Sequence, residues 1–251
     1  MPARRPSSAP DPAGDRHSVP LGSGQATAAT IYRAPAPAGR LLVVAHGAGA
    51  GQHHPFMTAM AARLSALGID VVTFDFAYMH AGRKVPDRAP VLETCFGGVI
   101  DWATGRDGFS GHRLLIGGKS MGGRMATHLA AAGYVAHGGA GPGLSGVVAL
   151  GYPLHPPGKP QQLRTAHLPA IRTPLLVVQG SRDAFGTPDE LRPVIATIPG
   201  PATLHVVEGG DHSFAVARTP REEVLGSVAD VIVRWASASA EASADKDSSN
   251  V

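Results

Sequence analysis

The sequence is poor in several features that define whole classes of protein. Cys95 is its single cysteine, so no disulfide can form within the chain and a thiolate metal cluster is not expected. No apolar stretch is long enough to span a bilayer, and we therefore expect no membrane partner. Charged residues make up 16% of the chain, are scattered and leave a net charge of only +3, which argues against a nucleic-acid partner.

The two ends of the chain lack the apolar residues of a targeting signal or of a folded core. The first residues contain no apolar core of a secretory signal, so we expect a cytoplasmic protein. Small and polar residues dominate 1–20 and 237–251, and we predict that both segments are disordered tails. The remaining residues, 21–236, suit one α/β domain with a sizeable core.

Apolar runs alternate with helical patterns along this domain. Strands are predicted at the runs of small or apolar residues, 26–32, 41–45, 69–74, 114–117, 146–150, 174–179 and 203–207. Helices are predicted at 56–67 and 90–102, after residue 120, and after the caps Thr187 and Thr219. This alternation predicts a three-layer α/β sandwich with a mostly parallel sheet. Only 151–173 separates two late strands, which leaves no room for a large cap domain.

The stretch Gly118-Lys119-Ser120-Met121-Gly122 organises the rest of the chain. A Gly-x-Ser-x-Gly sequence between a strand and a helix is typical of a nucleophile elbow, a sharp turn that lifts the serine hydroxyl above the sheet. Glycines two residues before and after the serine avoid a collision between the crossing backbones. The alternative is an ordinary glycine-rich turn. We take Ser120 as the candidate nucleophile.

A serine hydroxyl is a weak nucleophile until a base takes its proton, and an acid must orient that base. In the hydrolase arrangement the three groups follow in the order Ser, Asp, His on loops after successive strands. Asp183 follows one predicted strand and His212 follows the last one, so these residues are the candidate acid and base. The alternative for Asp183 is a turn or helix-capping residue. Asp211 is interpreted as a turn residue because it adjoins His212.

An oxyanion that develops at Ser120 needs two N–H donors. The predicted donors are Met121, directly after the serine, and Ala48, in the glycine-rich loop that follows the strand at 41–45. In that loop Gly47 and Gly49 let the backbone approach a substrate closely. The loop lacks the Gly-Lys-Ser/Thr ending of a phosphate-binding P-loop, so no nucleotide is expected.

Two loops at the same sheet edge, 77–89 and 151–162, are predicted to roof the substrate pocket. The candidate lining residues on these loops are Tyr78, Arg83, Tyr152 and His155. Arg83 would suit an anionic acyl or leaving group, and the alternative is a solvated charged loop. Lys119, beside the nucleophile, is expected to pair with a nearby carboxylate.

With the elbow, Asp183 and His212 in this order, the chain resembles the α/β-hydrolase superfamily over about 26–236. It is most similar to the small dienelactone-hydrolase-like branch, and within it to a subfamily that includes a testis-expressed protein and the hydrolase-like domain of a non-specific-lethal chromatin-complex subunit. The similar motifs are His46-Gly47-Ala48-Gly49, Phe74-Asp75-Phe76-Ala77-Tyr78, Pro86-Asp87-Arg88-Ala89-Pro90 and Gly118-Lys119-Ser120-Met121-Gly122-Gly123-Arg124. Dienelactone hydrolases carry cysteine where this chain has Ser120, which favours general ester chemistry over dienelactone.

These residues predict a serine hydrolase that cleaves a small or medium carboxylic ester, or a thioester, through an acyl-enzyme. The expected partner is a small-molecule ester, and the chemistry needs neither a metal nor an organic cofactor. The chromatin relative implies the second hypothesis, a hydrolase-like binding or scaffold protein with little turnover. The sequence does not predict an oligomeric state.

Overall fold

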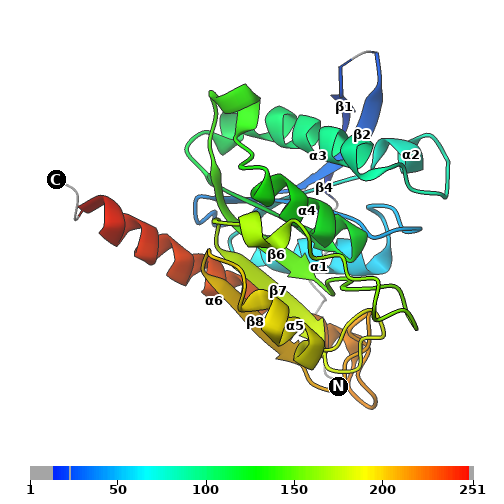
Figure 1. Cartoon of the computed structure of the whole chain (residues 1–251). Helices are drawn as coiled ribbons and strands as arrows, with labels where there is room; N and C mark the ends of the chain where they lie inside the picture. The colour runs from blue at the N-terminus through cyan, green and yellow to red at the C-terminus, as the bar shows by residue number, and fades with distance from the viewer. Residues whose placement is uncertain (1–13, 23, 249–251) are drawn as a thin grey trace, which may run out of the picture.

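The computed structural model describes residues 14–22 and 24–248, and one eight-stranded sheet forms its centre (Figure 1). The strands are β1 (Asp15–Pro20), β2 (Ala26–Tyr32), β3 (Arg40–Ala45), β4 (Asp70–Phe74), β5 (Arg113–Lys119), β6 (Leu144–Leu150), β7 (Leu175–Gly180) and β8 (Ala202–Val207). Their order across the sheet is β1-β2-β4-β3-β5-β6-β7-β8. β2 is antiparallel to both β1 and β4, and every later pair is parallel. The predicted mostly parallel sheet is confirmed.

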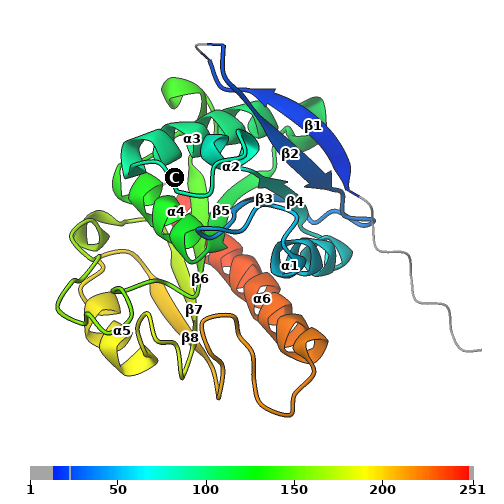
Figure 2. The ribbon, with the colours of Figure 1, turned by 90° about the vertical axis from the view of Figure 1, so that its right-hand side faces the viewer.

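Helices cover both faces of this sheet. They are α1 (Pro55–Ala66), α2 (Ala77–His80), α3 (Ala89–Thr104), α4 (Met121–Ala131), α5 (Pro188–Ile195) and α6 (Arg221–Ser248), with short 3-10 turns at Asp107–Phe109, Ala136–Gly139 and Leu168–Ala170. α1 and α6 lie against one face, whereas α3, α4 and α5 lie against the other (Figure 2). The predicted three-layer sandwich is confirmed.

The core divides into two layers because successive side chains of a strand point to opposite faces. In β3, Val43 and Ala45 pack with the α3 and α4 side chains, while Leu42 and Val44 pack with those of α1 and α6. Both layers are buried, so the strand reads as a continuous apolar run in the sequence. This double burial is the reason that the central strands were predictable.

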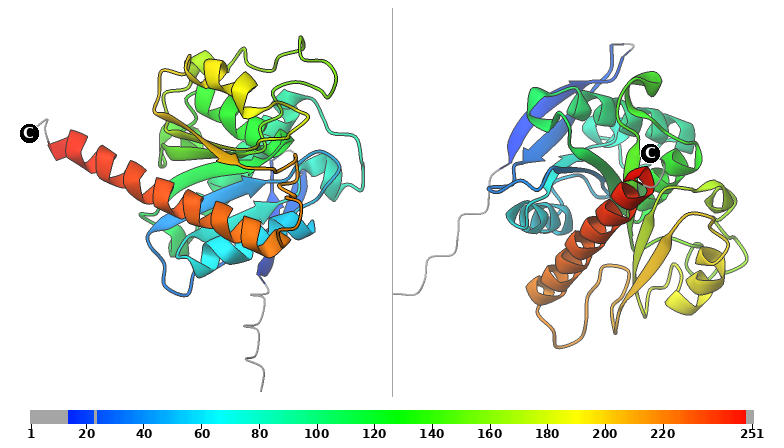
Figure 3. Two further views of the ribbon diagram at one scale, coloured as in Figure 1. Left: turned by 90° about the horizontal axis from the view of Figure 1, so that it is seen from below. Right: turned by 90° about the vertical axis from the view of Figure 1, so that its left-hand side faces the viewer.

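Both ends of the chain depart from the predicted tails of 1–20 and 237–251. Residues 15–20 form β1, which pairs antiparallel with β2 from Asp15 opposite Ile31 to Pro20 opposite Ala26. At the other end α6 continues to Ser248, because the alanines after Trp235 favour helix over coil. Figure 3 shows the end of α6 projecting past the strands. The predicted disorder of 1–13 and 249–251 lies outside the described residues.

The carboxyl ends of the parallel strands meet at one edge of the sheet, and the connections at 46–54, 75–88 and 208–220 leave from this edge. The connection between β6 and β7 contains only the turn at Leu168–Ala170, and within the described chain no segment forms a large cap. In the same described ranges, no helix combines the length and the hydrophobicity that crossing a bilayer requires.

Candidate active site

Ser120 lies on the sharp turn between β5 and α4. Its φ of 52° and ψ of −116° lie in a region that non-glycine residues rarely occupy, so the turn is strained. Two backbone hydrogen bonds hold it: Ser120 N–H donates to the Leu150 carbonyl at 2.8 Å, and Arg124 N–H donates to the Ser120 carbonyl at 3.0 Å. The serine side chain is thereby presented at the sheet edge.

Close packing of the backbone explains why glycines flank the serine. A Cβ added at Gly118 would overlap the backbone of Gly122 and approach the Ala45 carbonyl oxygen to 2.6 Å. A Cβ added at Gly122 would overlap the same Ala45 oxygen. Strand β5, helix α4 and strand β3 therefore pass closer together here than side chains allow, as the Gly-x-Ser-x-Gly pattern predicted.

Three side chains from distant parts of the sequence meet above this turn. His212 Nε2 lies 2.9 Å from Ser120 Oγ, and His212 Nδ1 lies 2.7 Å from Asp183 Oδ2. Asp183 is only 1% exposed, so its carboxylate meets the imidazole away from bulk water. Since a carboxylate only accepts hydrogen bonds, the imidazole proton lies on Nδ1 and Nε2 is free to accept the serine proton.

The Asp183 carboxylate is fixed by two further donors. Gln179 Nε2 donates to Oδ2 at 2.9 Å, and Phe185 N–H donates to Oδ1 at 2.8 Å. The fully buried Gln179 also accepts from Tyr152 N–H through Oε1, at 2.7 Å. Sequence reasoning missed Gln179, although a single polar residue at the end of an otherwise apolar strand was an available signal.

The loop after β3 lies opposite the start of α4. His46 is fully buried, donates from Nδ1 to the Gly47 carbonyl at 2.7 Å and accepts at Nε2 from Phe76 N–H at 3.1 Å. Burial lowers the pKa of His46, which keeps the imidazole neutral and able to accept. These bonds fix the peptide before Ala48. Met121 is the first residue of α4, where a backbone N–H has no partner within the helix.

A cavity of about 440 Å³ opens above Ser120. Its lining residues are Gly47, Ala48, Ala50, His54, Phe56, Met57, Lys119, Ser120, Met121, Arg124, Pro153, Arg164, Phe185, His212, Ser213 and Arg221. The volume is in the range of small-molecule sites. Of the predicted residues, the cavity thus brings together Ser120, His212, Met121, Ala48 and Gly47, whereas Gly49 lies outside the lining.

Tyr78 and Arg83 were predicted to line the pocket, and neither does. The Tyr78 ring is fully buried beneath the loop after β3, with its centroid 6.0 Å from that of His46. Arg83 instead forms a two-fold ion pair with Asp87, in which Nη1 to Oδ1 is 2.6 Å and Nη2 to Oδ2 is 2.8 Å. The solvated-loop alternative therefore describes Arg83 better.

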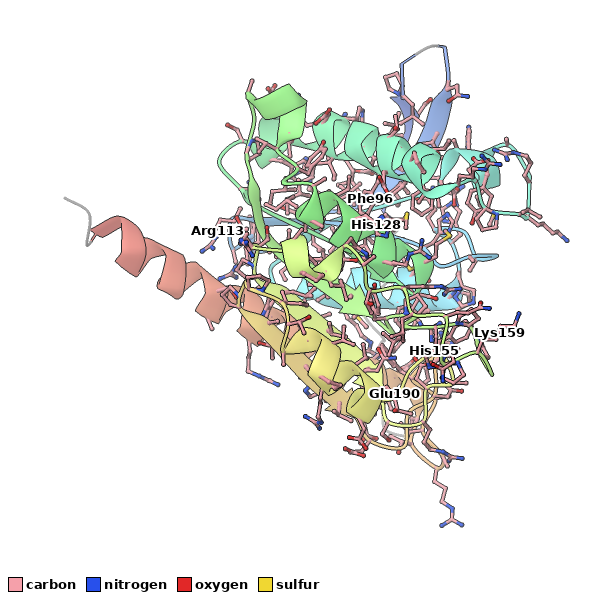
Figure 4. All side chains as sticks on the ribbon, in the orientation of Figure 1. Phe96, Arg113, His128, His155, Lys159 and Glu190 are labelled. Atoms are coloured by element: carbon pink, nitrogen blue, oxygen red, sulfur yellow. The ribbon has the colours of Figure 1, made fainter. Side chains whose placement is uncertain are left out.

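Tyr152 and His155 are also absent from the lining, because both turn into the protein. Tyr152 is 2% exposed and donates its hydroxyl proton to the Arg164 carbonyl at 2.6 Å. His155 is 5% exposed, and its Nε2 lies 3.3 Å from Glu190 Oε1 at the start of α5 (Figure 4). Both side chains are therefore buried within the loop that follows β6, and neither lines the cavity.

Lys119 does not have the carboxylate partner that was expected. Its Nζ is buried without a hydrogen-bond partner among the described residues. The ammonium instead faces two aromatic rings, 5.4 Å from the Phe214 centroid and 5.9 Å from that of Phe56. Burial lowers the pKa of Lys119 to about 8, and Lys119 lines the same cavity as Ser120.

The interpretation of Asp211 is confirmed, and Cys95 has a structural position as well. Asp211 is a turn residue, since its Oδ1 accepts from Ser213 N–H at 2.8 Å and from Ala215 N–H at 2.9 Å. Cys95 is a core residue of α3, and burial raises the pKa of its thiol to about 11. Within the part of the chain that the structure describes, no group of three or more His, Cys, Asp or Glu side chains is arranged to hold a metal ion.

The fold is shared with several solved structures. Dienelactone hydrolase from Anabaena variabilis aligns over 89% of this chain and 97% of its own, with a TM-score of 0.67 and 19% identity. Est1E from Butyrivibrio proteoclasticus, solved with ferulic acid, aligns over 88% and 99%, with a TM-score of 0.69 and 15% identity. A serine hydrolase without a lid from Xanthomonas campestris aligns over 92% and 96%, with a TM-score of 0.64 and 17% identity.

At these identities the structural comparisons establish the fold alone. A family model gives the independent result, because the model described as "Alpha/beta hydrolase domain" matches residues 38–238. That match spans β3 to most of α6 and includes every strand that contributes to the site. The chain therefore belongs to the alpha/beta hydrolase family.

Proposed function

We propose that this family member is a serine hydrolase that cleaves carboxylic esters, or thioesters, of small or medium size. The observation that carries the proposal is the hydrogen-bonded row of three side chains at the cavity. In that row Ser120 Oγ lies 2.9 Å from His212 Nε2, and Asp183 Oδ2 lies 2.7 Å from His212 Nδ1. A purely structural role would not require Ser120 and His212 to line a cavity of about 440 Å³.

In the proposed reaction Ser120 Oγ attacks the ester carbonyl while His212 Nε2 takes the hydroxyl proton. Asp183 holds the imidazole in the required tautomer and stabilises the imidazolium that forms. The N–H groups of Met121 and Ala48 stabilise the oxyanion. His212 then gives its proton to the leaving alcohol, and water hydrolyses the acyl-enzyme by the same steps in reverse order.

The fixed surroundings of these groups support the roles assigned to them. Gln179 and Phe185 N–H hold the Asp183 carboxylate, so little reorganisation is needed when the imidazole becomes charged. His46 holds the Gly47 peptide that precedes Ala48, which fixes one wall of the oxyanion site before a substrate arrives. The backbone strain at Ser120 is the kind that proteins retain at functional sites.

A covalent probe tests the nucleophile directly. A fluorophosphonate should label the wild-type protein and should not label Ser120→Ala. Ser213→Ala is the matched control, because Ser213 is the other serine that lines the cavity, and it should keep the label. Purified protein should also hydrolyse short p-nitrophenyl esters. Absence of both labelling and hydrolysis would reject this proposal in favour of the binding or scaffold hypothesis.

A further inference from the structure

The cavity wall is strongly basic, and its basic side chains form no ion pair among the described residues, although, against the larger effect of burial, the charges of Asp183 and Asp211 raise the pKa of Lys119. Lys119, Arg124, Arg164 and Arg221 all line it, and we refer to these four residues as the cationic wall. Among the described residues that line the cavity, none is an aspartate or a glutamate. None of the four belongs to a salt bridge within that part of the chain.

Overall composition does not explain this concentration of charge. The chain has 22 lysines and arginines against 19 aspartates and glutamates, so a random sample of its charged residues would be nearly balanced. The cations of the wall also act on one another. The positive charge of Arg124 is among the causes that lower the pKa of Arg164, after burial. Arg221 and Lys119 likewise lower the pKa of His54, again after burial.

Arg124 lines the same cavity as the nucleophile. It lies four residues after Ser120 on α4, and its Nε donates to His128 Nε2 at 3.4 Å. His128 Nδ1 lies 2.8 Å from Glu93 Oε1, so the Glu93 carboxylate is engaged by the His128 imidazole (Figure 4). The terminal nitrogens of Arg124 therefore remain for a ligand.

Arg164 is anchored through its backbone on both sides. Its N–H donates to the Leu154 carbonyl at 2.8 Å, and its carbonyl accepts from the Tyr152 hydroxyl at 2.6 Å. The guanidinium makes only a long contact, 3.5 Å, to the Pro153 carbonyl. An arginine with an anchored backbone and no carboxylate partner presents its guanidinium for an ion pair with a ligand.

Like charges that converge in a partly closed cavity raise the free energy of the free protein, and an anionic ligand reverses that effect. Arginine forks match carboxylate and phosphate oxygens in a two-fold geometry. Building on the hydrolase function proposed above, we propose that the substrate carries a carboxylate or a phosphate that binds Arg124 and Arg164 beside Ser120. The cationic wall is then a specificity element of the esterase site.

Pairs of esters that differ in charge alone test whether the site prefers an anionic substrate. In the first pair, mono-p-nitrophenyl glutarate carries an anionic acyl chain, and p-nitrophenyl 5-methylhexanoate replaces its carboxylate by an isopropyl group of the same shape. A third ester, p-nitrophenyl 4-phosphonobutanoate, distinguishes phosphate from carboxylate. In the second pair, 4-carboxyphenyl butanoate and 4-carbamoylphenyl butanoate place the difference in the leaving group.

Wild-type protein should prefer the anionic member of at least one pair, by roughly 10- to 100-fold in kcat/KM, as charge-assisted hydrogen bonds of this kind provide. The preference should decrease as salt is added. Arg124→Gln with Arg164→Gln should bring the ratio close to one, and Arg164→Gln alone should reduce it partly. Arg192→Gln, an exposed arginine of α5 outside the cavity, is the matched control and should keep the ratio.

A ratio near one in both pairs, with no preference for the phosphonate ester over p-nitrophenyl 5-methylhexanoate, would overturn the proposal while leaving the hydrolase function intact. A preference that survives in the double variant would overturn it as well. Binding measurements address the opposite case, in which the hydrolase function fails but the anion site exists. Calorimetric titration of Ser120→Ala with glutarate and with inorganic phosphate requires no turnover. If no ester is hydrolysed but one of these anions binds, and binding is lost with Arg124→Gln and Arg164→Gln, the anion site stands and the hydrolase function falls. If neither anion binds and no preference exists, the anion site is rejected.

Discussion

Two regions at the carboxyl edge of the sheet are rich in basic residues: the loop 82–88, which we name the basic loop, and the cationic wall of the cavity. In the basic loop Arg83 meets Asp87, which lies four residues later, at 2.6 and 2.8 Å, and the pair faces solvent. In the cationic wall no carboxylate lines the space that the side chains share. A basic residue therefore indicates a ligand site when no carboxylate of the same chain is paired with it.

The same contrast applies to acidic residues, and it gives the largest predicted effect. Asp183 binds the His212 imidazole and Asp87 binds the Arg83 guanidinium, but only Asp183 is buried against a residue that lines the cavity. Asp183→Asn should lower kcat for ester hydrolysis by about a thousand- to ten-thousand-fold, because the amide favours the wrong imidazole tautomer. Asp87→Asn should leave kcat unchanged. Steady-state kinetics of both variants on one p-nitrophenyl ester measures the difference, and comparable losses in both would remove Asp183 from the proposed triad.

The second prediction concerns lysines, one from each region. A pKa for Lys119 that falls from 10.5 to about 8 corresponds to about 3 kcal/mol of unfavourable free energy in the charged, buried form. Lys119→Met removes this charge and should raise the free energy of unfolding at pH 7 by about 2–3 kcal/mol. Lys84→Met, in the exposed basic loop, should leave it unchanged. Urea denaturation of the two variants and the wild type measures the comparison.

The pH dependence of this effect has a definite sign. Between about pH 8 and pH 10.5 the unfolded chain retains the Lys119 proton that the folded protein has lost, so the wild type gains stability as pH rises. The advantage of Lys119→Met should therefore be full below about pH 8 and should shrink above it. An advantage that grows with pH through this window would show that the Lys119 ammonium is not destabilised by burial.

The third prediction compares two glycines, Gly151, which adjoins Lys119 and His212, and Gly82 of the basic loop. Gly151 and Gly82 both have left-handed backbones, with φ of +63° and +75°. A Cβ at Gly151 would lie 2.6 Å from Lys119 Nζ and 3.4 Å from His212 Nδ1, whereas a Cβ at Gly82 meets no atom within 4 Å. Both alanine variants should lose about 1–2 kcal/mol of stability through backbone strain.

Only Gly151→Ala should also lose activity, by roughly tenfold in kcat, because small displacements of the imidazole reduce catalysis steeply. Thermal unfolding and ester hydrolysis of the two variants separate the shared strain from the local contact. If Gly82→Ala lost as much activity as Gly151→Ala, backbone strain rather than contact with the His212 region would explain the effect.

The parts of the fold that sequence analysis could predict are those where one physical pattern dominates. β3 and β7 are buried on both faces and therefore appear as continuous apolar runs. β1 was missed because Asp15–Pro20 is an edge strand in which Val19 alone is buried, so it carries no clear alternation of polar and apolar residues. The helical extension to Ser248 was missed because small residues that favour helix also resemble a flexible tail.

The candidate site also has a part that the sequence predicts and a part that it does not. Ser120, Asp183 and His212 were nominated from their order after successive strands, and the structure brings them together, but their catalytic roles stay predictions. The lining of the cavity was not predictable in this way. Tyr152 turns inward because its hydroxyl finds the Arg164 carbonyl, and a direction set by such a contact leaves no trace in local spacing. Arg124 was visible in the sequence only as part of a family motif.

The basic loop gives the smallest predicted effect, and it closes the comparison. The sequence predicts Arg83 as a residue that binds an anionic substrate. In the structure both terminal nitrogens of its guanidinium donate to the Asp87 carboxylate, and this hydrogen bonding lowers the pKa of Asp87. An exposed pair of this kind contributes little to stability, and it leaves no donor directed at the cavity. Arg83→Gln should therefore change neither the melting temperature nor the ratio of kcat/KM for anionic and neutral esters, in contrast to Arg164→Gln. A lower ratio in Arg83→Gln would place the anion under the basic loop and would show that a carboxylate partner within the chain does not exclude an arginine from substrate binding.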